Sequence, residues 1–168
     1  MNSKHLMAIA ALIGGSMEAK AQTPRTLIVG TWEVVSRVDR DSAGHISIEP
    51  ILGREPRGYL IYDAAGHVAA QLMSVQRTAS ACDVRGPTDS NNSTYVCAYD
   101  AYFGRYEVDA SAGTVIHVLD GALSPSDVGR RLTRRFQVAG DTLTIQFEVR
   151  GLRGQPLTRT MTWHRVST

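Results

Sequence analysis

Short stretches in which apolar and polar residues alternate run along almost the whole chain from Leu27 onward. An alternation of period two puts the apolar side chains on one face of an extended strand, so it predicts β-structure with one buried face. About nine such runs are rich in β-branched and aromatic residues: residues 28–38, 45–49, 58–62, 67–73, 103–108, 114–120, 131–138, 142–149 and 157–166. We therefore expect an all-β domain.

The connections between many of these runs are short and contain residues that tolerate a positive φ. Residues 63–66, 109–113 and 139–141 each place Gly and Asp between two extended runs. Turns this short join antiparallel neighbours. The sequence has no helical stretch between most runs and no Gly-rich phosphate loop, which excludes the parallel α/β nucleotide-binding folds. An antiparallel sandwich or barrel is expected.

One segment departs from the alternation. Residues 74–93 are rich in Ser, Thr, Asn, Asp and Gly, which predicts a long loop of the kind that often serves as a lid or binding loop. Apolar and aromatic residues then follow at helical spacing, with Asn92 or Ser93 as a suitable N-cap. This spacing predicts one short amphipathic helix that contains Tyr95, Val96, Tyr99, Tyr102 and Phe103.

The first residues have the organisation of a secretory signal. A charged start with Lys4 precedes an apolar run over residues 6–13, and Ala19-Lys20-Ala21 is an A-x-A cleavage site. The apolar run is about half of the roughly 20 residues that a membrane span needs, and the sequence has no second such stretch. We therefore predict a signal peptide over residues 1–21, cleavage near Ala21, and a periplasmic or secreted domain over residues 22–168.

Export changes how the two cysteines of the chain are interpreted. An oxidising compartment favours pairing, so a disulfide between Cys82 and Cys97 is predicted to tie the long loop to the short helix. The alternative, a Cys/His metal site, lacks the paired short spacings of such sites. No metal ligand is therefore proposed from the sequence.

Composition and charge narrow the function classes. The chain of 168 residues has 43% apolar and 20% charged residues, which is typical of one globular domain. Its 18 Lys and Arg against 16 Asp and Glu give a net charge of only +2, which argues against nucleic acid as a partner. The sequence has no Ser-His-Asp order, H-E-x-x-H helix or close carboxylate pair, so hydrolase chemistry and a bound cofactor have no support.

An ordered series of sequence blocks connects the chain to a known family. Gly30-Thr31-Trp32 matches the G-x-W signature of lipocalin and calycin barrels, and the blocks at residues 57–62, 102–109 and 134–136 and the last run with Trp163 follow it in order. Over nearly all of residues 22–168 the chain resembles the bacterial and fungal lipocalin-like domain family. The resemblance implies an antiparallel β-barrel of about eight to ten strands around a small-molecule cavity.

The resemblance also gives Trp32 a structural role. In lipocalins the tryptophan of the first strand closes the barrel floor against an arginine from a late strand, and Arg134 or Arg135 would take that place here. If Trp32 points inward, the alternation places three further residues on the same lumen face. They are Val34, Ser36 and Val38.

Several polar residues are candidates for a site in the lumen. His117 stands between Ile116 and Val118, where it is either a lumen group that titrates near neutral pH or a hydrogen-bonded core residue. His67 follows a tight turn and is either a site residue or an exposed residue at the barrel rim.

Tyrosines and arginines add to these candidates. Tyr62, Tyr102 and Tyr106 suit a pocket that orients a hydrophobic ligand with an oxygen function, although ordinary strand packing explains them equally well. Gly104 between two of the tyrosines leaves room for a ligand or another part of the chain. Arg57 either binds a carboxylate or enolate, or pairs with Glu55 at the surface.

The leading functional prediction is an exported lipocalin-like barrel that binds a small, mostly hydrophobic or amphipathic molecule in its lumen. The alternative is a cofactor-free isomerase, cyclase or lyase in which His117 or Tyr106 acts as general acid or base and an arginine stabilises negative charge. A third reading is an envelope protein that binds a protein partner through an exposed apolar surface.

Overall fold

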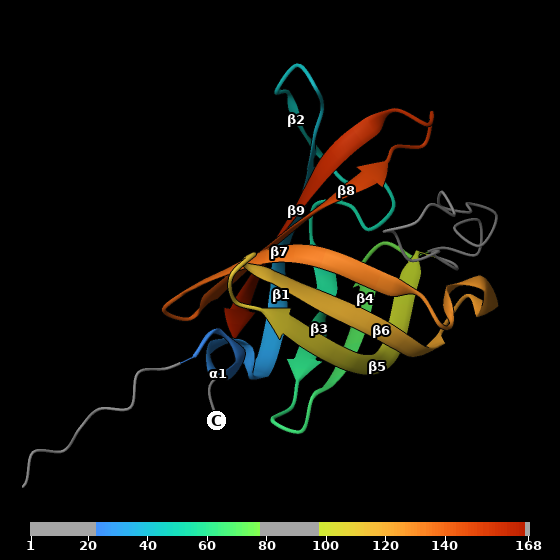
Figure 1. The fold of residues 1–168 in the computed structure, drawn as a ribbon. Coiled ribbons are helices and arrows are strands. Elements are labelled where there is room, and N and C mark those ends of the chain that lie inside the picture. The colour runs from blue at the N-terminus through green and yellow to red at the C-terminus, as the bar shows by residue number, and fades with distance from the viewer. Residues whose placement is uncertain (1–22, 78–97, 167–168) are drawn as a thin grey trace, which may run out of the picture.

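The computed structural model describes residues 23–77 and 98–166 and consists mainly of β-strands (Figure 1). The strands are β1 (Gly30–Arg40), β2 (Ile46–Ile48), β3 (Pro56–Tyr62), β4 (His67–Ser74), β5 (Tyr99–Asp109), β6 (Thr114–Ala122), β7 (Arg131–Ala139), β8 (Thr142–Arg150) and β9 (Pro156–Arg165). The short helix α1 (Pro24–Ile28) precedes them, and the 3-10 turn η2 (Pro125–Asp127) separates β6 from β7. The predicted all-β class is confirmed, and each predicted run contributes a strand.

Eight of these strands close into an antiparallel barrel. The strands from β3 to β9 pair in chain order, and β1 pairs with β3 on one side and with β9 on the other. Closure removes the free sheet edges that would otherwise expose unpaired backbone groups. The short β2 adds to β1 beyond the barrel. The prediction of an antiparallel barrel of about eight to ten strands is confirmed.

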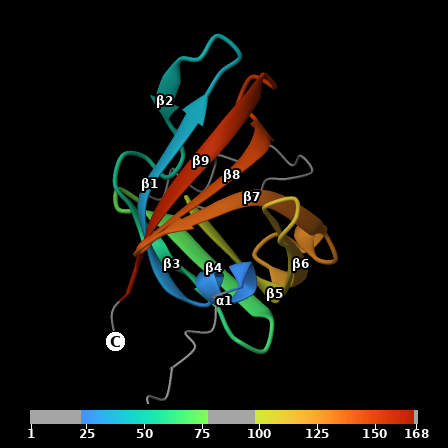
Figure 2. The same cartoon turned by 60° about the vertical axis from the view of Figure 1, so that its left-hand side comes forward.

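The barrel is taller on one side than on the other. The upper parts of β1, β8 and β9 extend together beyond the ends of β3 and β4, with β2 at their outer edge (Figure 2). They form a curved sheet at the end of the barrel that is opposite α1. We call this end the mouth and the end near α1 the closed end.

A β-bulge interrupts the pairing of β1 with β9. Val34 lies opposite Trp163, and the next paired residue, Ser36, lies opposite Thr162, so Val35 is the extra residue. An extra residue in one strand reverses the alternation of side chains between the two faces of the sheet.

The bulge turns two charged side chains into the barrel. Before it, Trp32 and Val34 are buried, whereas beyond it the buried residues are Arg37 and Asp39. The prediction of the lumen face is therefore correct for Val34 but wrong for Ser36 and Val38, which do not share the lumen face with Trp32. A regular alternation from Trp32 could not anticipate the reversal.

Trp32 seals the closed end of the barrel. It is fully buried, and its indole N–H donates to the carbonyl of Ile28 at the end of α1 at 2.8 Å. The Arg165 guanidinium carbon lies 4.0 Å from the centre of the indole ring. Arg165 also donates to the carbonyls of Val29, at 2.7 Å, and Leu27, at 2.8 Å. The arginine thus joins the last strand to the chain that enters β1.

The arginine over Trp32 is not the predicted one. Trp32 lies directly opposite Arg165 in the β1–β9 pairing, whereas Arg134 on β7 pairs with Val115 on β6. The prediction that Arg134 or Arg135 closes the floor is therefore wrong. The Arg134 guanidinium lies instead 3.9 Å from the ring centre of Phe147.

Gly30 makes room for this stack. Its φ of +141° lies in a region that side chains with a Cβ rarely adopt, and a Cβ there would lie 2.6 Å from Nη1 of Arg165. The glycine of the G-x-W signature is thus required by the backbone and by its neighbour. Gly104 has a comparable role, because a Cβ there would lie 2.0 Å from the carbonyl oxygen of Val118 on β6.

The two halves of β7 pair with different strands. Residues 131–135 pair with β6, and residues 135–139 pair with β8. Residues 147–150 of β8 pair with β9 on their other side, and in this region β8 diverges from β7 (Figure 1). We call this divergence the fork; it lies in the side wall of the barrel.

The predicted short helix is wrong where the structure describes it. Residues 99–103 form the first half of β5, which pairs with β4 and β6, and Asp100 and Tyr102 alternate inward. Strand pairing on both sides overrides the local helical spacing. Residues 1–21, Cys82, Cys97, most of the predicted loop and the first residues of the predicted helix lie outside the described residues, so the signal peptide and the disulfide stay predictions. Among the described residues, no helix is long and apolar enough to span a membrane.

Replacing Arg165 by Ala is expected to lower the free energy of unfolding by about 2–3 kcal/mol, because the stack on Trp32 and two hydrogen bonds are lost. The measurement is urea unfolding followed by tryptophan fluorescence. Arg135→Ala, at an exposed position of β7, is the control and is expected to change stability by less than about 0.5 kcal/mol. Equal effects of the two substitutions would contradict the role of Arg165 in sealing the closed end.

Candidate functional site

His117 lies in the barrel interior between two tyrosine hydroxyls. The Tyr62 hydroxyl is 2.7 Å from Nε2, and the Tyr102 hydroxyl is 2.9 Å from Nδ1. The three side chains come from β6, β3 and β5, and inward alternation on each strand brings them together. His117 is fully buried, with an exposed fraction of 0%. Of the two sequence-based interpretations of His117, the hydrogen-bonded core residue fits the structure. A group that titrates near neutral pH does not, because burial holds the pKa of His117 well below its usual value.

Burial sets the protonation states of this trio. It holds the pKa of His117 well below its usual value, with a further lowering by the Arg134 charge. Burial raises the pKa of both tyrosines, most strongly for Tyr62. A neutral imidazole has one N–H and one lone pair, so one tyrosine donates to the ring and the other accepts from it. A change of tautomer would exchange these two roles.

The lumen beside the trio is almost filled by side chains. A cavity of about 20 Å³ remains. It is lined mainly by apolar residues, and by His117, Tyr102, Arg134, Arg37 and Asp100 among the polar ones. A cavity of this size holds one water-sized group.

Asp100 is the unusual acid of this cavity. It is 5% exposed, and its Oδ1 has no hydrogen-bond partner among the described residues. Burial raises the pKa of its carboxyl group to about 6, although Arg37 and Arg134 act to lower it. The indole Nε1 of Trp163, a residue that lines the same cavity, also has no partner in the described part of the chain.

A cluster of four buried charges separates the lumen from the mouth. Arg159 donates from Nε and Nη2 to the two carboxylate oxygens of Asp39, at 2.7 and 2.8 Å. Glu49 lies 3.8 Å from Arg159 and 3.7 Å from Arg37. Burial lowers the pKa of Arg37 to about 10, and the Arg159 charge acts in the same direction. We call these residues the ion cluster.

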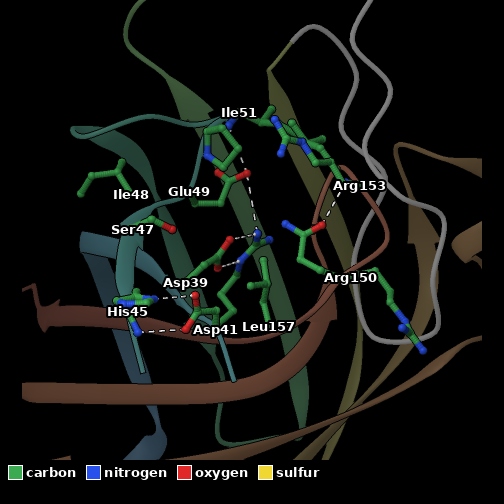
Figure 3. A pocket seen from close by; sticks show the side chains of 15 residues that line it. Asp39, Asp41, His45, Ser47, Ile48, Glu49, Ile51, Arg150, Arg153 and Leu157 are labelled. Atoms are coloured by element: carbon green, nitrogen blue, oxygen red, sulfur yellow. Dashed lines mark hydrogen bonds and ion pairs between the residues drawn. The ribbon is translucent and has the colours of Figure 1, made fainter. Parts of the chain in front are cut away.

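The mouth contains a much larger cavity, of about 440 Å³, above the ion cluster (Figure 3). Asp39 and Arg159 contribute to its floor, and the other residues come from the β1–β2 connection, β2 and the segment after it, and the ends of β8 and β9 with the turn between them. Its apolar members include Ile48, Ile51 and Leu157. Arg150 and Arg153 stand at its rim on the β8–β9 side. Small-molecule sites commonly have volumes in this range.

Tyr106 lies next to the trio but does not bind the histidine. Its ring packs edge-on against Tyr62, with 4.9 Å between ring centres. Its hydroxyl donates to the carbonyl of Asp63 at 2.8 Å, toward the closed end. Tyr106 therefore supports the position of Tyr62.

Two further candidates of the sequence lie outside the barrel. His67 is exposed and binds Asp63 through Nδ1 at 2.8 Å. Arg57 is exposed on β3, beside a shallow hollow on the outer surface. The structure does not bring either residue to the lumen.

A repeated turn explains the His67 contact. Residues 41–45 and 63–67 share the pattern D-x-A-G-H, and in both turns Oδ1 of the aspartate accepts backbone N–H groups while Oδ2 contacts the histidine ring. The first turn borders the mouth cavity, which Asp41 and His45 line. The aspartate–histidine contact is thus a property of the turn and does not by itself indicate a catalytic pair.

Sequence reasoning missed the charged residues of the interior. Asp100, Arg37, Asp39 and Arg159 lie in strands, where a charged residue is normally assigned to the exposed face. Asp100 could have been placed by its spacing of two from Tyr102. Arg37 and Asp39 could not, because their inward position depends on the bulge.

The fold and this interior define a calycin-type β-barrel with a polar lumen and an open mouth. The family model for the lipocalin-like domain matches residues 29–166, so the chain belongs to the lipocalin-like domain family. No curated protein matches the sequence. Within the described residues, no group of three or more His, Cys, Asp and Glu side chains is placed to hold a metal ion.

His117 and Asp100 are expected to affect the pH dependence of stability in opposite directions. The folded pKa of His117 is below its unfolded value, so its contribution is lost as the pH falls below about 6.5. The folded pKa of Asp100 is raised to about 6, so the folded state gains stability as the pH falls from about 6 toward 4.

Two variants separate these contributions. In Asp100→Asn the free energy of unfolding should fall, relative to wild type, by up to about 1.4 kcal/mol per pH unit between pH 6 and 4.5. In His117→Asn it should instead rise relative to wild type as the pH is lowered below 6.5. Urea unfolding at a series of pH values measures both. If the free energy of unfolding of a variant changes with pH in parallel with that of the wild type, the result would contradict a shifted pKa for the replaced residue.

Proposed function

We propose that this barrel binds a small amphipathic molecule at its mouth. A lipocalin-like barrel is suited to small-molecule binding in general. The observation that carries the proposal is the cavity of about 440 Å³ above the buried Asp39–Arg159 pair. The remaining space in the lumen is about twenty times smaller, so the mouth is where a ligand fits without displacing side chains.

The lining of the mouth suggests how such a ligand lies. Ile48, Ile51 and Leu157 offer apolar surface to its body. Arg150 and Arg153 at the rim offer N–H groups to oxygen functions. The floor is a charge pair whose members already bind each other, so it favours a ligand that places no single charge against it.

Leu157→Trp is designed to fill the mouth cavity without touching the ion cluster directly. Native mass spectrometry of protein purified from its own host should show a co-purifying small molecule on the wild type, and at least a tenfold lower occupancy on this variant, because the indole occupies the ligand's space. Ile61→Trp, at an exposed position on the outer face of β3, is the matched control. Equal occupancy of both variants would contradict a site at the mouth.

We further propose that the protein acts after export, in the periplasm or outside the cell. The charged start, the apolar run and the A-x-A site of residues 1–21 support this, and the family match begins after them. The same compartment supports the Cys82–Cys97 disulfide.

One measurement tests export and pairing together. The intact mass of the protein from the periplasm or medium should correspond to a chain that begins at Gln22, and alkylation without reduction should add no mass, because both thiols are paired. Reduction before alkylation is the control and should add two adducts. A full-length chain would contradict export, and two adducts without reduction would contradict the disulfide.

A second candidate function, a cofactor-free isomerase, cyclase or lyase, is favoured by the trio in the lumen. His117 is neutral and hydrogen-bonded on both ring nitrogens, so it can take a proton on one side while a proton leaves on the other. Arg134 is close enough to influence its pKa and would stabilise negative charge in a reacting group.

For this candidate, His117→Asn should lower the turnover of the co-purifying molecule by at least about a hundredfold, which is the contribution typical of general acid–base catalysis. This reaction requires the substrate to enter the lumen, because the ion cluster separates His117 from the mouth. Binding at the mouth should therefore remain within about twofold of the wild type. Product formation is followed by chromatography and NMR, since an isomer keeps the mass of its substrate. An unchanged rate would remove His117 from the reaction.

A further inference from the structure

The strongest unexplained feature of the interior is a pair of buried polar atoms on two residues that line one small cavity. Asp100 and Trp163 are 5% and 2% exposed, and Oδ1 of the one and Nε1 of the other have no hydrogen-bond partner among the described residues. Buried polar atoms without partners are rare and destabilising. Oδ1 of Asp100 is a hydrogen-bond acceptor, and Nε1 of Trp163 is a donor. Together they suit a ligand group that can both donate and accept a hydrogen bond.

A hydroxyl group meets this requirement. Its proton can be donated to Asp100, and its oxygen can accept from the indole N–H of Trp163. The cavity of about 20 Å³ matches one oxygen-sized group. The pKa of Asp100 is raised only to about 6, so at pH 7.5 it is a carboxylate that favours a donor and repels an anion.

The position of Phe147 indicates where the rest of a ligand with such a hydroxyl group would lie. Its ring lines the same cavity and is stacked against the guanidinium of Arg134, with 3.9 Å from the guanidinium carbon to the ring centre. Phe147 also lines a hollow of about 440 Å³ on the outer surface at the fork between β7 and β8. Among the described residues, Phe147 is the one that lines both spaces.

We propose that the lumen has a second binding site, for a molecule with a phenolic ring. The ring takes the place of Phe147 on Arg134, and its hydroxyl occupies the cavity beside Asp100 and Trp163. The molecule enters through the fork, where Phe147 turns outward into the surface hollow. This site goes beyond the proposed function, because it is separated from the mouth by the ion cluster and uses none of the residues that line the mouth cavity.

The indole N–H signals in ¹H–¹⁵N spectra provide a direct test on the wild type. The chain has two tryptophans. Trp163 is the reporter, and Trp32, whose N–H already donates to Ile28, is the internal control. Titration with phenol at pH 7.5 should move the Trp163 signal downfield and leave the Trp32 signal unchanged. Toluene, which has no hydroxyl, and benzoate, which Asp100 repels, should bind at least tenfold more weakly than phenol.

Three variants sharpen this test. Phe147→Ala opens a ring-sized space at the fork and should bind phenol at least tenfold more tightly than the wild type, because no side chain has to be displaced. Phe147→Leu is the milder variant and should show a smaller gain in the same direction, which keeps the comparison available if the alanine variant does not fold. Asp100→Asn should weaken phenol binding and reduce the discrimination against benzoate.

The two sites are distinguished by Leu157→Trp, which should abolish ligand binding at the mouth and leave phenol binding unchanged. Loss of phenol binding in this variant would place phenol at the mouth and overturn the lumen site. An unmoved Trp163 signal at saturating phenol, or equal affinities for phenol and toluene, would also overturn it and leave the cavity as a place for a buried water only.

Discussion

The pairing of β1 with β9 is the constraint on which the rest of this barrel depends. It closes the sheet, places Arg165 over Trp32 at one end, and includes the bulge that turns Arg37 and Asp39 inward toward the other. A regular β1 would keep both charged side chains at the surface. One inserted residue thus converts the upper barrel from an apolar tube into an interior with charged groups.

The buried charges of the lumen and the ion cluster are equal in number. They are Arg37, Arg134 and Arg159 against Asp39, Glu49 and Asp100, with the bidentate Asp39–Arg159 pair as the best-satisfied contact. A further buried acid, Asp127, pairs with Arg130. Buried ion pairs contribute little net stability, because desolvation offsets most of their attraction, but removal of one partner is costly. The ion cluster therefore adds little to the free energy of unfolding. Its main effect is to hold its four side chains in fixed positions between the mouth and the lumen.

The sequence could predict the fold more fully than the site, for physical reasons that particular residues show. Alternation and turn chemistry depend on local residues, so the strands and their antiparallel order followed from them. They left a sandwich or a barrel open, and the barrel was implied by the family resemblance. His117, Tyr62 and Tyr102 were named as candidates, and the structure brings them together, although Tyr102 was expected in the short helix and lies in β5. The arginine that stacks on Trp32 was not predicted correctly, because its identity depends on which strand pairs with β1 to close the barrel. The charges of the ion cluster were missed because a bulge has no signature in the alternation of β1, and the predicted helix failed because β5 gains pairing on both sides.

The polar lumen differs from an interior that only stabilises a fold. An apolar residue of similar size in place of Asp100 would avoid a carboxylate oxygen without a partner, and a phenylalanine in place of Tyr62 or Tyr102 would still fill the barrel. The trio and Asp100 instead keep hydrogen-bonding groups around a space for one oxygen, beneath an apolar ring stacked on an arginine. The ion cluster prevents this space from merging with the mouth. The barrel therefore has two compartments of different chemistry: a wide one at the mouth with apolar and charged residues in its lining, and a narrow one in the lumen beside Asp100 and Trp163. The two share no lining residue.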